Sequence, residues 1–238
     1  MPAAPFSPYE QLAARLLPYS RSAIGDASHD FSHLLRVWKN ITSICAEEGG
    51  DGEILLAATL LHDCVAIEKN SPLRTHASRL AADKATSVLN ELGWSKTRID
   101  AVAHAIEAHS FSSGVEPKTL EAFILRDADR LDAIGAVGIA RCFYVAGRMS
   151  SALYDPGDPS AEMRHLNDSR YALDHFHAKL FGLTEGFHTR QAQKLSQERR
   201  ARLKRFYDAF MDEITIDDAD DVGLASPTPL ARSRQAAG

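Results

Sequence analysis

Apolar residues recur at intervals of three and four along nearly the whole chain, and no stretch alternates convincingly at intervals of two. The first pattern places apolar side chains on one face of an α-helix, whereas alternation would indicate a half-buried strand. The clearest example is a stripe near the C-terminus that comprises Leu203, Phe206, Tyr207, Phe210, Met211 and Ile214. The sequence therefore predicts an all-α fold.

The same periodicity predicts helices upstream of that stripe, over Tyr9–Leu17, Phe31–Glu47, Glu53–Asp63, Ser78–Leu92, Lys96–His109, Thr119–Gly147 with a break, and Arg170–Phe181. Ser150–Asp168 is rich in Asp, Pro and Gly, so we expect an irregular segment there, either a lid over a site or a long connection. Residues 1–216 should form one helical domain. Residues 217–238 begin acidic and continue rich in Pro, Ser and Ala, which predicts a mobile tail.

Composition excludes several classes of protein. Three widely spaced cysteines, with no CxxC motif, exclude a disulfide framework and a thiolate zinc site, and they favour a reducing compartment. The net charge of −5 argues against a nucleic acid polymer as partner. The longest apolar run, Ile54–Leu61, is too short to span a membrane, and no signal peptide is visible. We therefore expect a cytoplasmic protein.

The run Ile54–Leu61 leads directly into His62 and Asp63. An ionised carboxylate at the end of a buried helix costs several kcal/mol unless a cation or strong hydrogen bonds compensate it. The partial negative charge of the helix C-terminus adds to that cost. A bound metal cation would account for the doublet, and a histidine–aspartate pair with its polar atoms in water is the alternative.

Other histidines lie on predicted helices. His33 and Arg36 share one face at the start of their helix, and His29, one turn earlier, is best interpreted as a surface residue. His109 shares the face of Val102 and Ile106 and should point inward, as a site residue or as a hydrogen-bonded core histidine. His104 lies on a different face of the same helix.

Three carboxylates follow an apolar run in Asp127-Ala-Asp-Arg-Leu-Asp132. Like charges so close together repel one another unless cations intervene. Helical phase favours Asp127 as the inward residue, whereas Asp129 groups with Leu125 and Asp132. Periodicity alone leaves the choice between Asp127 and Asp129 open.

The order His33, His62-Asp63, Asp129 resembles the H…HD…D signature of the HD-domain superfamily of metal-dependent phosphohydrolases. Longer strings resemble its YedJ-like branch: His29-Asp-x-x-His-x-x-Arg-Val37, Leu61-His-Asp63, Lys69-Asn-x-Pro-x-Arg74, Ala105-Ile-x-x-His-Ser-Phe-Ser112, Asp127-Ala-Asp-Arg-Leu131 and Arg170-Tyr-Ala-Leu-Asp-His175. The resemblance covers roughly residues 10 to 210, and these strings together are far more specific than an HD doublet.

The resemblance implies that one divalent metal is bound at the centre of the helical domain by His33, His62, Asp63 and Asp129. It thus favours Asp129 where phase favours Asp127. Two imidazoles and two carboxylates suit Mn, Ni, Co, Fe or Zn better than Mg, which prefers oxygen ligands and retained water. A second metal is compatible with the spare histidines.

The implied activity is hydrolysis of a small, nucleotide-like phosphoester or phosphoanhydride. Asp63, Lys69 and His109 are the expected catalytic residues. The expected substrate-binding residues are Arg36, Lys69, Arg74, His104 and His109. Relatives that hydrolyse guanosine tetraphosphate or deoxynucleoside monophosphates carry acidic residues where this chain has Ala66 and Ile67, which makes both activities less favoured.

Two other functions are consistent with the sequence. A di-iron oxygenase could recruit His29, His104 and His109 around a second metal. A non-catalytic module could use the metal only to hold helices together. A homo-oligomer is compatible with either function and with hydrolysis.

Overall fold

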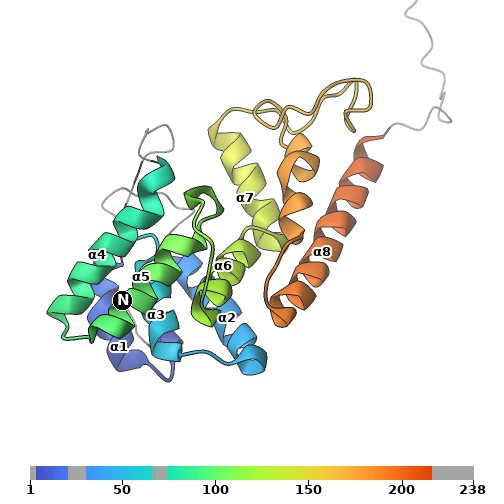
Figure 1. The fold of residues 1–238 in the computed structure, drawn as a ribbon. Helices are drawn as coiled ribbons and strands as arrows, with labels where there is room; N and C mark the ends of the chain where they lie inside the picture. Colours follow the sequence, from blue (N-terminus) through green and yellow to red (C-terminus); the bar gives the residue numbers. More distant parts are fainter. Residues whose placement is uncertain (1–3, 21–30, 66, 68–73, 216–238) are drawn as a thin grey trace, which may run out of the picture.

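The computed structural model describes residues 4–20, 31–65, 67 and 74–215, and the elements of regular structure in these residues are helices (Figure 1). The main helices are α1 (Glu10–Leu16), α2 (Phe31–Glu48), α3 (Gly52–Leu61), α4 (Ala77–Glu91), α5 (Lys96–His109), α6 (Leu120–Asp132), α7 (Gly135–Arg148) and α8 (Arg190–Ile214). Short helical turns are η1 (Ala4–Phe6), η2 (Leu17–Tyr19), η3 (Arg74–His76), η4 (Phe111–Ser113), η5 (Phe176–Leu180) and η6 (Gly182–Thr184). The described residues contain no strand, and the all-α prediction is confirmed.

Helix α3 lies at the centre of the N-terminal half. Every residue from Ile54 to Leu61 is buried, as the continuous apolar run predicts. The side chain of Asp51 caps the helix by accepting hydrogen bonds from the backbone N–H groups of Glu53 and Ile54. Helices α1, α2, α4, α5 and α6 all pack against α3. The buried helix therefore directs its C-terminal residues, His62 and Asp63, into the interior of this group.

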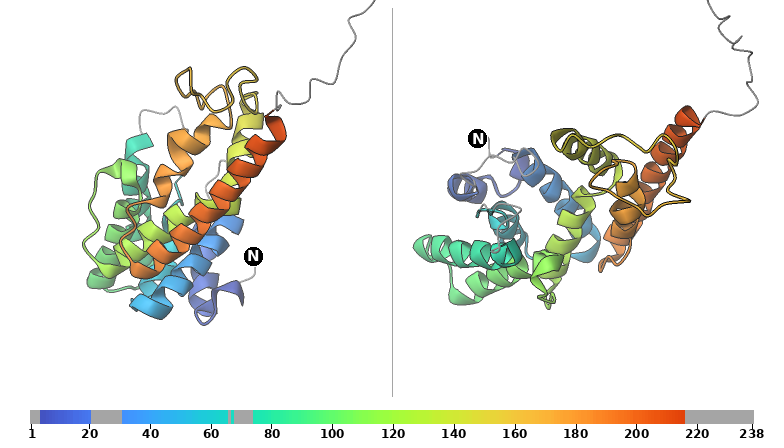
Figure 2. Two further views of the ribbon diagram at one scale, coloured as in Figure 1. Left: turned by 90° about the vertical axis from the view of Figure 1, so that its right-hand side faces the viewer. Right: turned by 90° about the horizontal axis from the view of Figure 1, so that it is seen from above.

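Helix α6 joins the two halves of the molecule, because it packs against α2, α3 and α5 on one side and against α7 and α8 on the other (Figures 1 and 2). The predicted break in Thr119–Gly147 falls between α6 and α7, where Gly135 has a φ of +71°. A Cβ atom there would lie 3.0 Å from Cγ of Arg199. Positive φ and close packing together favour glycine at this corner.

The predicted helix over Arg170–Phe181 is wrong for its first half. Ala152 donates its N–H to the carbonyl of Arg170 and accepts one from Ala172, each at 2.9 Å. These bonds to a distant segment replace the local bonds of a helix. Regular structure begins only at η5, a π-helical turn, and this contact could not be found from periodicity.

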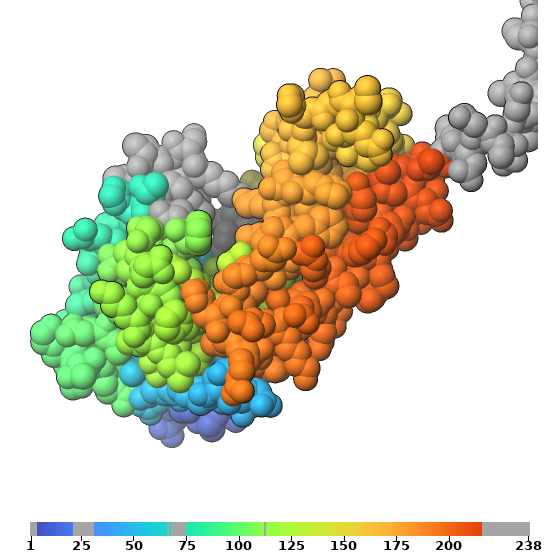
Figure 3. All heavy atoms as spheres, turned by 45° about the vertical axis from the view of Figure 1, so that its right-hand side comes forward, coloured from blue at the N-terminus to red at the C-terminus, as the bar shows by residue number. Residues whose placement is uncertain are grey.

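Ser150–Asp168 is irregular, as predicted, and it is tied down by Arg164, whose guanidinium donates two hydrogen bonds to the buried Asp174. The predicted tail lies outside the described residues. Among those that are described, no helix has both the length and the apolar character needed to cross a membrane. Figure 3 shows a hollow in the surface between the green residues around 105–120 and the yellow and orange residues of the C-terminal half.

Candidate metal centre

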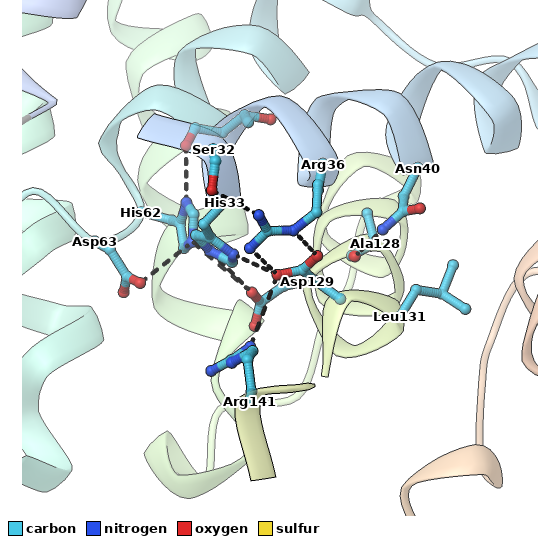
Figure 4. A network of polar contacts seen from close by, with 12 residues as sticks. Ser32, His33, Arg36, Asn40, His62, Asp63, Ala128, Asp129, Leu131 and Arg141 are labelled. Atoms are coloured by element: carbon cyan, nitrogen blue, oxygen red, sulfur yellow. Dashed lines mark hydrogen bonds and ion pairs between the residues drawn. The ribbon is translucent and has the colours of Figure 1, made fainter. Parts of the chain in front are cut away.

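Five polar side chains from four parts of the chain converge at the end of α3. His33 comes from the first turn of α2, His62 and Asp63 follow α3, Asp129 comes from α6, and His109 is the last residue of α5. Figure 4 shows the side chains of His33, His62, Asp63 and Asp129 directed toward a common region. The structure thus brings together the four residues predicted as ligands, together with His109.

The potential ligand atoms lie close to one another. Nε2 of His33 is 3.2 Å from Nε2 of His62 and 3.5 Å from Oδ1 of Asp129. Nε2 of His62 is 3.5 Å from Oδ2 of Asp63 and 3.9 Å from Oδ1 of Asp129. Two overlapping groups, His33–His62–Asp129 and His62–Asp63–His109, each have their donor atoms within 4.8 Å of one another.

Hydrogen bonds on the far side of each imidazole fix which nitrogen faces the centre. Nδ1 of His33 lies 2.9 Å from Oδ2 of Asp132, and Nδ1 of His62 lies 2.8 Å from the carbonyl oxygen of Thr59. A carbonyl and an ionised carboxylate only accept hydrogen bonds, so both Nδ1 atoms carry hydrogen. In the neutral rings, the two Nε2 atoms therefore present lone pairs to each other and to carboxylates. Such a set of acceptors needs a proton or a metal cation between its members.

The histidines of the site are buried, whereas its carboxylates are partly exposed. His33 and His62 are each 1% exposed, whereas the side chains of Asp63 and Asp129 are 38% and 32% exposed. The imidazoles therefore lie deepest, and the carboxylates separate them from solvent. A ligand would approach from the carboxylate side.

The charge of the site attracts cations. Burial opposes protonation of His33, but its hydrogen bond to Asp132 and the negative charges of Asp129, Asp132 and Asp63 outweigh burial and raise the pKa of His33. Burial, helped by the neighbouring His109 and His33, lowers the pKa of His62 despite the negative charges of Asp63 and Asp129. The field of the carboxylates is therefore large enough to favour a cation at the first imidazole but not at the second.

Asp132 supports the site from behind, and the sequence analysis did not single it out. Its side chain is 2% exposed and contacts His33, and it accepts hydrogen bonds from Nε and Nη2 of Arg36 at 2.6 and 3.0 Å. Burial alone would raise the pKa of Asp132, but the hydrogen bonds from His33 and Arg36 hold it well below its usual range. The available signal was the spacing of three residues between Asp129 and Asp132, which places both on one helical face.

Asp127 is buried, as helical phase predicts, but it lies away from the histidines. Its carboxylate accepts hydrogen bonds from the backbone N–H groups of His188 and Thr189 and from the Thr189 hydroxyl, at 2.8 to 3.1 Å. Asp127 therefore anchors the start of α8, and Asp129 is the carboxylate beside His33. Phase detected burial correctly, but it could not tell which buried environment Asp127 occupies.

The other predicted site residues are distributed differently. Nε2 of His109 is 4.0 Å from Oδ1 of Asp63, so His109 borders the cluster. His104 lies apart from it, and its Nε2 accepts a hydrogen bond from the N–H of Lys118 at 2.9 Å. Lys69 and His29 lie outside the described residues, and Arg74 is described only by its backbone in η3.

Comparisons with known proteins agree with this geometry. The HD domain family matches residues 30–134, which include every residue of the cluster. YpgQ of Bacillus subtilis, an uncharacterised protein, is 31% identical over 214 residues, which cover 87% of this chain and 96% of YpgQ. A crystal structure of an HD-superfamily hydrolase from Bacillus thuringiensis is 30% identical, with a TM-score of 0.66 over 86% of this chain and 96% of that one.

Bacillus subtilis YpgQ has also been crystallised in complex with ADP. That structure is 30% identical to this chain, with a TM-score of 0.63 over 86% of this chain and 97% of that one. The sequence similarity extends well beyond the matched domain and over most of both proteins. One structural neighbour of the chain is thus described as an HD-superfamily hydrolase. The chain itself belongs to the HD-domain family.

Proposed function

We propose that this protein is a metal-dependent phosphohydrolase that acts on a small, nucleotide-like phosphoester or phosphoanhydride. The observation that carries the proposal is the convergence of two buried Nε2 atoms, 3.2 Å apart, with the carboxylates of Asp63 and Asp129, each of which lies 3.5 Å from one of them. Two imidazoles and two carboxylates are a donor set for a divalent transition metal. Membership of the HD-domain family supports the same function.

In this proposal, the metal ligands are His33, His62, Asp63 and Asp129. The donor set fits Mn, Ni, Co, Fe or Zn better than Mg. A divalent cation at this point would polarise a phosphoryl oxygen and lower the pKa of a water molecule, which is the chemistry that hydrolysis near neutral pH requires. Asp132 and the Thr59 carbonyl hold the Nδ1 side of the two imidazoles, so that Nε2 of each ring would be available to a bound ion.

His109 is positioned to accept or donate a proton. Its Nδ1 lies 2.5 Å from the carbonyl oxygen of Ile106, so Nδ1 donates and Nε2 faces Asp63. An imidazole held in this way can accept a proton at Nε2 or donate one to a leaving group. His109 and Asp63 are therefore the proposed catalytic residues within the described part of the chain, and Lys69 is the proposed catalytic cation in the segment after the HD doublet.

The proposed substrate carries phosphate and resembles a nucleotide. Lys69 and Arg74 are cations in the segment after the HD doublet, and they would neutralise charge that develops on phosphoryl oxygens. Arg36 lies on the same face as His33, but its three guanidinium nitrogens already donate to Asp132 and Ser32, so its part in substrate binding would be the smaller one. The crystal structure of YpgQ with ADP supports a small phosphorylated ligand for this chain. His104 does not enter the proposal, because its ring nitrogen is occupied by the Lys118 N–H.

A di-iron oxygenase is the second candidate, because the two possible ligand groups overlap at His62 and the second one includes His109. Two metals could share this cluster. The two candidates differ in metal number and in their need for oxygen. One metal per chain with phosphate release in anaerobic buffer supports the hydrolase, whereas two irons with oxygen consumption would replace it.

The direct test is a screen of nucleotides and other phosphoesters against protein stripped of metal and reloaded with Mn²⁺, Ni²⁺, Co²⁺ or Mg²⁺. We expect phosphate or pyrophosphate release that depends on a transition metal. Asp129→Asn should lose both metal and activity, and Asp127→Asn provides a matched control on the same helix that keeps the metal. A loaded protein that is stable but hydrolyses none of the substrates would instead support a metal-stabilised, non-catalytic module.

A further inference from the structure

A second arginine reaches the metal centre from α7, beyond the residues matched by the HD domain family. Nη1 of Arg141 lies 3.7 Å from Oδ2 of Asp132, the carboxylate that also holds His33. In Figure 4, the Arg141 side chain extends toward the aspartates from the side opposite α2. Arg141 thus places a positive charge beside the proposed ligands, and it comes from the half of the molecule that carries α7 and α8.

Arg36 and Arg141 differ in how their donors are used. Each of the three guanidinium nitrogens of Arg36 donates a hydrogen bond, two to Asp132 and one to Ser32. Arg141 makes no hydrogen bond within the described part of the chain, and its distance of 3.7 Å from Asp132 is too long for one. Its side chain is 30% exposed, so the donors are open to solvent next to the site.

The charges at this position do not balance. Two guanidinium groups, those of Arg36 and Arg141, face the single carboxylate of Asp132. Asp63 and Asp129 are nearby, but in the proposed function the bound metal would compensate their negative charges. One positive charge with free N–H donors therefore remains beside the ligand set. A guanidinium with free donors matches the geometry of phosphate oxygens, which it can bind through two parallel hydrogen bonds.

We propose that Arg141 is a substrate-binding residue that contacts phosphoryl oxygens of the bound substrate. The proposal rests on the proposed function for the identity of the substrate, but the binding of phosphate can be tested without turnover. It assigns to Arg36 mainly the positioning of Asp132 and to Arg141 direct contact with the substrate. It also gives α7 a part in the site, so that phosphate is held between the two halves of the molecule.

The test compares Arg141→Gln and Arg141→Lys with Arg148→Gln, a matched control because Arg148 is an exposed arginine two turns further along the same helix. Binding of inorganic pyrophosphate to the Mn²⁺-loaded protein is measured by calorimetry, and metal content is measured on each variant. We expect Arg141→Gln to weaken pyrophosphate binding about 10- to 100-fold, because hydrogen bonds to charged groups are worth that much. Arg141→Lys should recover part of the loss, and Arg148→Gln should bind like the wild type.

Metal content should stay unchanged in all three variants. Equal binding of pyrophosphate by the wild type and Arg141→Gln would overturn the proposal, and so would a wild type that binds no pyrophosphate. Loss of metal from Arg141→Gln would show that Arg141 supports the ligands instead of the substrate.

The two proposals can fail separately. A wild type that binds pyrophosphate through Arg141 but hydrolyses no phosphoester would remove the proposed function and leave the phosphate site. If the wild type and Arg141→Gln hydrolyse nucleotides with the same kcat/KM, the proposed function stands and the proposed role of Arg141 is wrong.

Discussion

Two buried aspartates in different halves of the protein are each held by an arginine, yet they serve different regions. The side chain of Asp132, on α6, is 2% exposed and pairs with Arg36, while that of Asp174, in the segment before η5, is 1% exposed and pairs with Arg164. Both pairs use two guanidinium nitrogens on two carboxylate oxygens, at 2.5 to 3.0 Å. Both pairs are therefore bidentate, although Arg36 uses Nε and Nη2 and Arg164 uses Nη1 and Nη2.

The difference lies in the third partner of each carboxylate. Asp132 accepts a hydrogen bond from Nδ1 of His33 and so determines which nitrogen of that ring faces the candidate metal centre. Asp174 accepts one from the backbone N–H of Asn167 at 2.6 Å and so holds an irregular segment in place. The same ion pair can orient a ligand in one place and order a loop in another. The third partner of the carboxylate, more than the ion pair itself, determines the role of the pair.

The largest expected effect is on metal affinity in Asp132→Asn. The change removes the negative charge between two guanidinium groups and weakens the orientation of His33. Loss of such supporting partners costs roughly 10- to 100-fold in metal affinity. Titration of the stripped protein with Mn²⁺ measures it, and Asp174→Asn serves as the matched control with unchanged affinity. Equal losses in both variants would show that the two pairs do not differ as described.

The second effect is on stability in Asp174→Ala. The change leaves Arg164 without its buried partner, although this arginine is still stacked 4.6 Å over the Tyr171 ring and is 20% exposed. Breaking such a pair from one side destabilises the fold, and the partial exposure of Arg164 reduces the loss. Thermal unfolding should shift downward by roughly 4–8 °C. A shift of less than 1 °C would show that the pair contributes little.

The third prediction concerns pH. Burial alone would raise the pKa of Asp174, but the hydrogen bonds from Arg164 and from the Asn167 N–H outweigh burial and lower it. A carboxyl group whose folded-state pKa lies below its unfolded value, about 3.9, stabilises the fold above that value. That contribution is lost as the pH falls through the folded-state pKa. In urea unfolding, the difference in stability between the wild type and Asp174→Asn should shrink as the pH falls from 6 toward 3, and a constant difference would contradict the assignment.

The smallest effects are expected from Arg36→Lys and Arg164→Lys. Each change keeps the charge but replaces a planar pair of donors with one ammonium group. We expect Arg36→Lys to weaken Mn²⁺ binding by a few fold and Arg164→Lys to lower the unfolding temperature by a few degrees with normal metal binding. Both measurements are made on both variants. Weaker Mn²⁺ binding in Arg164→Lys, or a lower unfolding temperature with normal Mn²⁺ binding in Arg36→Lys, would contradict the roles assigned to the two pairs.

The fold and the centre of the site could be predicted from sequence to the extent that local patterns determine them. The buried helix α3 follows from one apolar run, and the inward position of His109 follows from its spacing from Ile106. The choice between Asp127 and Asp129 needed more than phase, because both lie on the same helix and Asp127 is buried against the start of α8. There, the family resemblance favoured the residue that the structure places beside the histidines.

Features that depend on distant contacts were not accessible from the sequence. The segment after Arg170 is held by Ala152 instead of by its own helical bonds, so periodicity predicted a helix that starts too early. Arg141 joins the site only because α7 turns at Gly135 and passes Asp132. Neither feature leaves a local signal, because tertiary packing determines both.

The central claim is that His33, His62, Asp63 and Asp129 bind one divalent cation. Anomalous diffraction from crystals grown with Mn²⁺ tests it directly. We predict one strong peak within roughly 2.0–2.3 Å of a donor atom from each of the four side chains. A map in which Mn²⁺ occupies another position, or in which the four side chains remain in place with no peak between them, would contradict the claim.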